Sequence, residues 1–256
     1  PWTVSFESRF GVAIAITILL PSAFNLSIMR VSIHQPHYLP WLRYFDKIAR
    51  SDVFIVLDTI QYNKNGWQNR NRIKTAHGPL LLTVPVFDRF GQSLDEVRID
   101  NAIPWARKHL RSIEQAYHGA PFFAEHAEFL RDVYQRDWTR LNDLNFHMLG
   151  YFLAALGIRT RILRASELDV PGTATERLVQ LVRAAGGNRY FSGAYAVGAY
   201  LDASLFANAG IVLEWQQWTA PVYPQRYGPF EPDLSIIDLL FNCGPQSLDI
   251  LLGGRA

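Results

Sequence analysis

The chain contains little cysteine: Cys243 is its single thiol. No disulfide can therefore form within the chain, and a reducing compartment is the simpler environment for such a protein. We accordingly expect a cytoplasmic protein that is stabilised by a hydrophobic core. Apolar residues make up 49% of the 256 residues and charged residues 19%, which is the composition of a globular protein rather than of a disordered or fibrous one.

A large net charge of either sign is also missing. The 25 basic and 23 acidic side chains leave a formal charge of +2, so the surface as a whole exerts no strong pull on polyanions. This balance argues against nucleic acid and acidic membrane surfaces as general partners. Any attraction for a charged ligand must therefore be local.

Apolar runs of membrane-spanning length are absent. Residues 11–24 are apolar, but this run is shorter than the ~20 residues that a spanning helix needs, and its flanks lack the cleavage site of a signal peptide. We therefore expect no stable membrane insertion. Because Met29 leads directly into the first convincing strand, we predict that it is the natural start. Residues 1–28 would then be a non-native or disordered extension, and residues 29–256 one domain.

Strand and helix patterns alternate along most of the chain, which predicts a Rossmann-like, mostly parallel α/β fold. Residues 104–156 carry helical patterns without a strand between them and are predicted to form a helical insertion. The expected strands are residues 31–35, 53–57, 80–86, 97–99, 159–163, 189–192 and 211–215. The other expected helices are residues 41–50, 173–185, 194–207 and 235–241, with a short one after Pro245.

The turn after the first predicted strand is unusually polar. His34, Gln35, His37 and Tyr38 occupy it, and Trp41 opens the following helix. Ligands of open parallel sheets bind at the carboxyl ends of the strands, where a helix N-terminus offers N–H groups to an anion. A lone histidine here would more often be a capping residue, but the whole cluster favours a ligand site. His34 and His37 are therefore our candidate catalytic residues.

A metal site is not expected in this turn. His34 and His37 are possible ligands, but no third cysteine, histidine or carboxylate follows with the spacing of a metal site. The sequence indicates no particular cofactor.

The second predicted strand ends at Asp58 and opens onto residues 59–87, which contain no acidic residue. Lysine suits phosphate as a mobile point charge, and arginine offers it a bidentate fork. A solvated basic loop is the plainer interpretation of a charge run, but here aromatic and amide side chains are interleaved with the cations. We therefore predict a phosphate pocket whose substrate-binding side chains are Lys47, Gln61, Lys64, Trp67, Asn69, Arg70, Arg72 and Lys74, together with Gln35, Tyr38 and Trp41 of the turn.

Two further segments carry candidate residues. Thr175 and Arg177 lie at a predicted helix N-terminus, which suits a phosphate, although such threonines are usually caps. A loop rich in proline and aromatic residues precedes the predicted helix of residues 235–241. In and after this loop we expect Tyr223 and Gln225 to contact the substrate, and Asp233, Ser235, Asp238 and Asn242 to support the site from behind.

Several ordered blocks of the sequence resemble the WbqC-like protein family. They are residues 34–41 (HQPHYLPW), 44–48 (YFDKI), 61–62 (QY), 67–74 (WQNRNRIK), 82–86 (LTVPV), 190–193 (YFSG) and 235–242 (SIIDLLFN). The resemblance covers the chain from Met29 to its C-terminus. Because members are associated with bacterial O-antigen and other surface-polysaccharide gene clusters, it implies work on a nucleotide-linked sugar or its precursor.

The chain departs from the family pattern at two positions. Arg43 stands where a glycine is expected, and Thr59 stands where a second acidic residue often follows Asp58. A cation held by paired carboxylates in relatives is therefore in doubt for this chain. A weaker likeness connects the first β-α-β unit to nucleotidylyltransferases, although Pro40 replaces the second histidine of their H-x-G-H signature. This likeness favours a nucleotide ligand and assigns no reaction.

These observations lead to one main hypothesis and one alternative. The main hypothesis is a transferase-like enzyme of surface-polysaccharide biosynthesis that acts on a phosphorylated or nucleotide-linked small molecule. His34 or His37 would be the general acid or base, and Asp58 would orient a histidine or a substrate hydroxyl. The alternative is a non-catalytic nucleotide-sugar or glycan-binding protein of a biosynthetic complex. The oligomeric state does not follow from the sequence.

Overall fold

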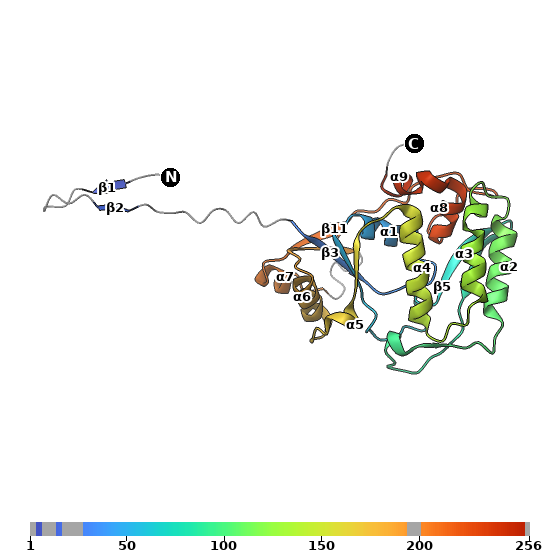
Figure 1. Cartoon of the computed structure of the whole chain (residues 1–256), viewed down its shortest axis with the longest axis horizontal. Coiled ribbons are helices and arrows are strands. Elements are labelled where there is room, and N and C mark those ends of the chain that lie inside the picture. Colours follow the sequence, from blue (N-terminus) through green and yellow to red (C-terminus); the bar gives the residue numbers. More distant parts are fainter. Residues whose placement is uncertain (1–3, 7–13, 17–27, 194–200, 254–256) are drawn as a thin grey trace.

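The computed structural model describes residues 4–6, 14–16, 28–193 and 201–253. Its centre is a five-stranded, fully parallel sheet in the order β11-β10-β3-β4-β9 (Figure 1). The strands are β3 (Arg30–His34), β4 (Val53–Val56), β9 (Arg161–Arg164), β10 (Arg189–Gly193) and β11 (Val212–Gln216). The α/β class and the parallel sheet predicted from the sequence are thus confirmed.

The first strand of the sheet in the chain, β3, is also its middle strand. The chain builds outward to β4 and β9 on one side, then returns to place β10 and β11 on the other side. The direction of building therefore reverses between β3 and β10. Such a reversal opens a crevice at the carboxyl ends of the strands, because the connections leave toward opposite faces.

Helices cover both faces of the sheet. Along β4, Val53 and Ile55 belong to one core cluster, while Phe54 and Val56 belong to the other, as the two-residue period of a strand requires. The first cluster is completed by α6 (Ala174–Ala184) and α7 (Ala203–Asn208). The second is larger and includes residues of α1 (Leu42–Ala49), α2 (Trp105–Tyr117), α3 (Phe123–Gln135), α4 (Leu141–Leu156), α8 (Ile236–Cys243) and α9 (Ser247–Leu251).

The predicted helical block of residues 104–156 consists of the three helices α2, α3 and α4. In Figure 1 they stand beside α8, at the end of the molecule away from α6 and α7. Gly157 ends α4 in the left-handed conformation, with φ of 71°, which a glycine adopts without strain. A short helix that the sequence analysis missed, α5 (Ala165–Leu168), directly follows β9.

The basic segment differs from its prediction, because part of it is a strand. β5 (Arg70–Thr75) pairs antiparallel with β6 (Gly78–Thr83), and this hairpin is separate from the central sheet. The single strand predicted at residues 80–86 is in fact divided. Pro85 has no N–H to continue the ladder of hydrogen bonds. The next strand, β7 (Val86–Phe87), pairs instead with β8 (Arg98–Ile99). The short 3₁₀ helix η1 (Leu94–Glu96) lies between β7 and β8 in the chain.

The N-terminal strands stand apart. β1 (Val4–Phe6) and β2 (Ile14–Ile16) pair with each other in a sheet of their own, away from the main body in Figure 1. That Met29 is the natural start stays a prediction. The first part of the helix expected at residues 194–207 lies outside the described residues, and α7 begins only at Ala203.

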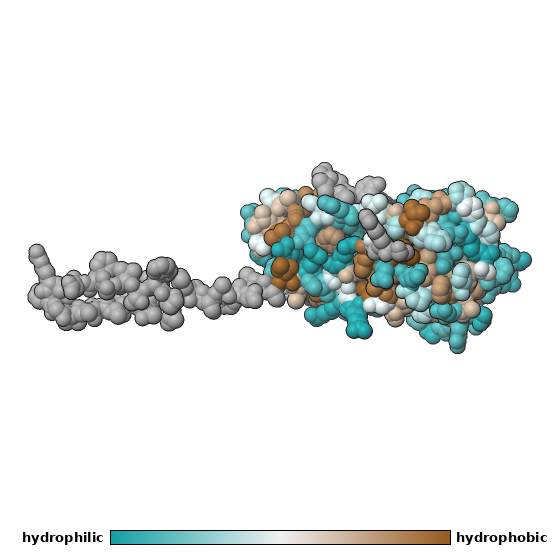
Figure 2. Space-filling model, turned by 90° about the horizontal axis from the view of Figure 1, so that it is seen from above, coloured by the Kyte–Doolittle hydropathy of each residue, from teal (hydrophilic) through white to brown (hydrophobic). Residues whose placement is uncertain are grey.

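The surface of the main body is mixed in character. Hydrophilic and hydrophobic residues are interspersed over the face shown in Figure 2. In the part of the chain that the structure describes, no helix combines the length and the apolar character needed to cross a membrane.

Candidate functional site

A pocket of about 710 Å³ lies at the carboxyl ends of β3 and β4. Its volume is within the usual ~300–1,000 Å³ of small-molecule sites. The pocket lies where the order of the strands reverses, which is the position expected for a ligand in this class of sheet. Its polar lining comes from His34, Gln35, Thr59, Gln61, Thr173, Arg177 and Tyr190.

The N-terminus of α6 forms one wall of this pocket, through residues 172–174 and Arg177. The Arg177 guanidinium donates to the backbone oxygen of Thr59 at 3.3 Å and to its hydroxyl at 2.5 Å. These bonds hold the cation across the end of β4. Thr175 has another role, because its hydroxyl accepts from the backbone N–H of Asp202 at 3.1 Å and so anchors the start of α7.

His34 separates the pocket from a group of buried rings. Its ring lies 4.8 Å from that of His37 and 5.1 Å from that of Tyr44, both with edge-on geometry. His37 is 2% exposed and Tyr44 is 1% exposed. Neither ring nitrogen of His37, nor the hydroxyl of Tyr44, has a hydrogen-bond partner among the described residues. Unpaired buried polar atoms are rare in folded proteins and call for an explanation.

Lys47 joins this group from the next turn of α1. Its amine is buried and donates to the backbone oxygen of Ile33 at 3.3 Å. Burial, and secondarily the charge of Arg43, lowers the pKa of Lys47 to about 7. Burial and the nearby Lys47 lower the pKa of His37 to about 3, and the same causes lower the pKa of His34 well below its ordinary value. Both histidines are therefore uncharged at neutral pH.

Tyr44 was not among the residues predicted for the site. Tyr44 and Lys47 are three residues apart on α1, which is the spacing that places side chains on one helix face. This spacing could have identified Tyr44 from the sequence, because α1 directly follows the histidine turn and Lys47 was already a predicted site residue.

The histidine turn and β5 come together, as the sequence predicts, but through backbone and amide groups. Tyr38 N–H donates to the Gln68 backbone oxygen at 3.2 Å, and the Gln68 amide donates to the Gln35 side chain at 2.7 Å. Asn71 donates to the Leu39 backbone oxygen at 2.5 Å. Trp41 and Trp67 meet edge-on at 5.2 Å.

The four cations of this segment do not converge on one pocket. Lys64 is exposed and pairs with Asp88 at 3.1 Å, and Arg70 donates to the Lys64 backbone oxygen at 2.9 Å. Arg72 lies 6.0 Å from the Trp67 ring centre. Arg70, Arg72 and Lys74 alternate along β5 and so share one face of the strand, but each contacts a different group: the Lys64 backbone, the Trp67 ring and the loop before α8. The expectation of one phosphate pocket built from Lys64, Arg70, Arg72 and Lys74 is therefore replaced by the pocket at His34 and Arg177.

Lys74 belongs to a buried polar network around Asp238. Its amine donates to the Gln225 side chain at 3.0 Å and to the Pro229 backbone oxygen at 2.6 Å. The Asp238 carboxylate accepts from Tyr117 at 2.8 Å, from Tyr223 at 2.9 Å and from Gln225 at 2.8 Å. Burial raises the pKa of Asp238, against the effect of these hydrogen bonds. The network fixes the loop before α8, and it places Lys74, Tyr223 and Gln225 outside the pocket lining.

Other predicted residues have structural partners. The Tyr38 hydroxyl lies 2.8 Å from His109 Nδ1 and 2.5 Å from the Tyr134 hydroxyl, between α2 and α3. Asn69 donates to the Val84 backbone oxygen at 2.8 Å. Around α8, the Ser235 side chain caps the helix, the Asp233 backbone oxygen accepts from Arg72 at 3.5 Å, and Asn242 donates to the Asp238 backbone oxygen at 2.7 Å.

The Asp58 carboxylate is also hydrogen-bonded to a neighbouring residue. Its two carboxylate oxygens accept from the backbone N–H of Ser166 at 2.9 Å and from the hydroxyl of Ser166 at 2.7 Å. Asp58 thus fixes the start of α5 beside β4, instead of contacting a histidine. It is a positioning residue.

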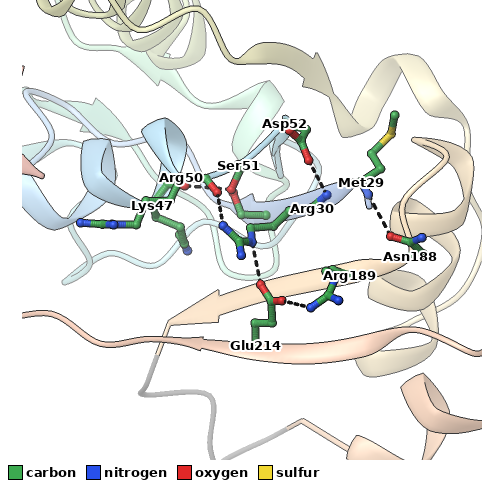
Figure 3. Close-up of polar contacts among 10 residues, drawn as sticks. Met29, Arg30, Lys47, Arg50, Ser51, Asp52, Asn188, Arg189 and Glu214 are labelled. Atoms are coloured by element: carbon green, nitrogen blue, oxygen red, sulfur yellow. Dashed lines mark hydrogen bonds and ion pairs between the residues drawn. The ribbon is translucent and has the colours of Figure 1, made fainter. Parts of the chain in front are cut away.

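The opposite edge of the sheet has a different chemistry. At the amino ends of the strands, Glu214 pairs with Arg30 at 2.6 Å and with Arg189 at 2.5 Å (Figure 3). Arg30 also donates to the Arg50 backbone oxygen at 2.9 Å. These cations are neutralised by a carboxylate, whereas the causes that shift His34, His37 and Lys47 include no carboxylate.

The buried histidines should make the folded protein less stable at acidic pH. The pKa of His37 falls to about 3 and that of His109 to about 4 on folding, from 6.5. Their stabilising contribution is present above pH 6.5 and is lost as pH falls toward these values, at up to about 1.4 kcal/mol per pH unit for each histidine. Urea unfolding between pH 7 and pH 5 should show this loss. The change in the free energy of unfolding per pH unit should be smaller in His37→Phe than in the unmodified chain. It should not be smaller in a variant of the exposed His77.

The described residues contain no group of three histidine, cysteine, aspartate or glutamate side chains that could hold a metal ion. Of the predicted site residues, the pocket brings together His34, Gln35, Gln61 and Arg177. His37 and Lys47 lie behind His34.

The chain is similar to a known protein family and to a protein of Mycobacterium tuberculosis. The model of the WbqC-like protein family matches residues 35–250. The uncharacterized protein Rv1507c of Mycobacterium tuberculosis (strain ATCC 25618 / H37Rv) is 40% identical over 226 residues, which cover 87% of this chain and 97% of that protein. No solved structure matches the chain significantly. The family match begins directly after β3 and runs through α8, and the chain belongs to the WbqC-like protein family.

Proposed function

We propose that the chain is a cytoplasmic, transferase-like enzyme of bacterial surface-polysaccharide biosynthesis. Its substrate would be a nucleotide-linked sugar or a phosphorylated precursor. The observation that carries the proposal is the pocket of about 710 Å³ at the carboxyl edge of the sheet, with His34 on one side and Arg177 on another. The family membership supports the substrate class, because the family resemblance implies work on such molecules.

The strand order supports a Rossmann-like arrangement as part of this proposal. From β9 to β11 the strands run third, second, first, fourth and fifth in chain order. Folds with this order bind nucleotides at the reversal, with phosphates at a helix N-terminus. In this chain α6 presents its N-terminus there, and Arg177 adds a permanent positive charge.

The pocket residues suggest a division of labour. His34 lines the pocket and is uncharged at neutral pH, because burial lowers its pKa. Its unprotonated ring nitrogen is therefore available to accept a proton from a substrate hydroxyl or amine, with a lower base strength than that of an exposed histidine. Gln35 and Gln61 offer amide groups to sugar hydroxyls. Asp58 holds the end of β4 through Ser166.

The direct test is mass spectrometry of nucleotide sugars incubated with the pure protein, with and without acyl and amino-group donors. A shifted mass in one nucleotide sugar is the expected result, and the size of the shift names the transferred group. Binding of a nucleotide sugar without any mass change would contradict the enzyme and support the alternative, a binding protein of a biosynthetic complex. Heat-inactivated protein is the control.

A further inference from the structure

Another cavity, of about 430 Å³, is lined by the arginines Arg89, Arg98 and Arg140 and by the ring of Phe87. Its volume suits a small molecule. It has no lining residue in common with the pocket at His34. The cavity is therefore a separate candidate site, and its chemistry differs from that of the pocket.

Backbone pairing places three of these side chains in one row. Phe87 is opposite Arg98 in the ladder of β7 and β8, and Arg98 is opposite Arg140 in an isolated antiparallel bridge. Directly opposed residues of antiparallel strands project to the same face. The next residues, Ile99 and Leu141, are buried, so Phe87, Arg98 and Arg140 face solvent, and all three are exposed. We call these three residues the cationic row.

The two arginines of the row occupy the closer of the two kinds of antiparallel pair. The Ile99 N–H donates to the Thr139 backbone oxygen at 3.0 Å, and the Leu141 N–H donates to the Val97 backbone oxygen at 3.0 Å. These bonds flank the two arginines instead of joining them, which defines a non-hydrogen-bonded pair with Cα atoms ~4.5 Å apart. Like charges directly opposite each other destabilise such a pair. The fold therefore carries a repulsion at this cavity.

Nearby acids do not neutralise the arginines of the cavity. In the part of the chain that the structure describes, none of the three forms a salt bridge. Glu96 is the acid of the lining, so three positive charges face one negative charge. The Asp95 carboxylate bonds to the Ser93 hydroxyl, and only the backbone oxygen of Asp95 accepts from Arg140, at 3.4 Å. An anion in the cavity would offset the repulsion.

We propose that this cavity binds a small phosphate ester, with the phosphate between Arg98 and Arg140 and the organic group on the ring of Phe87. A phosphate ester carries roughly two negative charges at neutral pH and presents three acceptor oxygens, which matches two guanidinium forks. A carboxylate carries a single charge and would balance only one of the two arginines. Phe87 is 58% exposed and offers an apolar surface beside the charges. The site is additional to the pocket of the proposed function and does not depend on it.

Phenyl phosphate and inorganic phosphate are the probes, because only the first has a ring to contact Phe87. Their affinities for the full chain are measured by phosphorus NMR at about pH 8, where both are dianions. Sodium chloride at ~0.15 M screens attraction between distant exposed charges. Phenyl phosphate should bind several-fold more tightly than phosphate, and Phe87→Ala should remove this difference. Phe90→Ala, which truncates another exposed ring of the same loop, is the matched control and should keep it.

Charge variants test the arginine pair. Arg98→Gln/Arg140→Gln should weaken the binding of phenyl phosphate by about 10-fold or more, and it should raise Tm because the repulsion disappears. Arg107→Gln/Arg111→Gln removes the same charge from exposed positions of α2, so its affinity should match that of the unmodified chain. Arg177→Gln changes the pocket and should keep the binding that the first variant removes.

Four results would overturn the inference. They are no binding of phenyl phosphate at millimolar concentration, equal affinity in Phe87→Ala and Phe90→Ala, equal weakening in the two double variants, and loss of all binding in Arg177→Gln. The last result would assign the phosphate to the pocket instead. The proposed function is tested separately by product formation from nucleotide sugars, so either proposal can fail while the other stands.

Discussion

Replacing His34 with Ala should lower kcat on the substrate by about 10²–10⁴-fold, which is the usual contribution of a positioned general base. His34 is the histidine of the pocket lining, and burial lowers its pKa well below the ordinary value, so its ring is unprotonated at pH 7 and has a nitrogen free to accept a proton. The measurement is steady-state turnover of the nucleotide sugar that mass spectrometry identifies. Thermal unfolding of the variant should stay cooperative, because His34 is only half-buried.

The matched control for this experiment is His77→Ala. His77 is exposed, in the turn between β5 and β6, and lies outside the pocket. It should keep the kcat of the unmodified chain. Equal activity of His34→Ala and His77→Ala would remove His34 from the mechanism and leave the pocket as a binding site only.

Replacing Asp238 with Ala should lower the free energy of unfolding by about 3–5 kcal/mol, a large share of the ~5–15 kcal/mol that stabilises a typical domain. The carboxylate accepts hydrogen bonds from Tyr117, Tyr223 and Gln225, and the Lys74 amine bonds to Gln225. Removal of the acceptor leaves buried donors without partners, which is more costly than the loss of the bonds themselves. Urea unfolding monitored by tryptophan fluorescence measures the difference.

Asp249→Ala is the matched control for the stability experiment. Asp249 lies exposed in the first turn of the neighbouring helix α9, so its removal should cost about 1 kcal/mol or less. Tyr223→Phe removes one of the three donors to Asp238 and should cost about 1 kcal/mol. If Asp238→Ala were as stable as Asp249→Ala, the network would not be what holds the loop before α8.

The fold was largely predictable, because apolar runs carry a local signal. The residues of β3 and β4 read as buried strands from sequence, and the observed bounds differ by one residue at the ends. β5 was missed because its alternation is hidden by polar residues: Asn71 is buried beside Ile73, and its amide is satisfied by the backbone of Leu39. Only the partner makes such a polar position favourable in a core.

The sequence predicted the location of the site better than it predicted which residues line it. The turn at His34 lies at the pocket, and Lys47 lies beside it, but the Tyr38 side chain points between α2 and α3 and Lys74 points to the loop before α8. Sequence spacing shows which residues are neighbours along the chain. It does not show which of several polar neighbours finds a partner in a distant segment.

The sequence by itself determined the α/β class, the parallel β-α-β start and the polar turn that ends the first strand, because all three depend on local periodicity and turn chemistry. The tertiary structure alone decided that β10 returns beside β3, which creates the pocket and brings Arg177 to it. It also decided the partners of the acids, since Asp46 binds Arg50, Asp58 binds Ser166, Asp88 binds Lys64 and Asp238 binds Gln225. The physical reason is that desolvation and charge pairing depend on contacts between segments far apart in the chain, and periodicity within a segment carries no information about them.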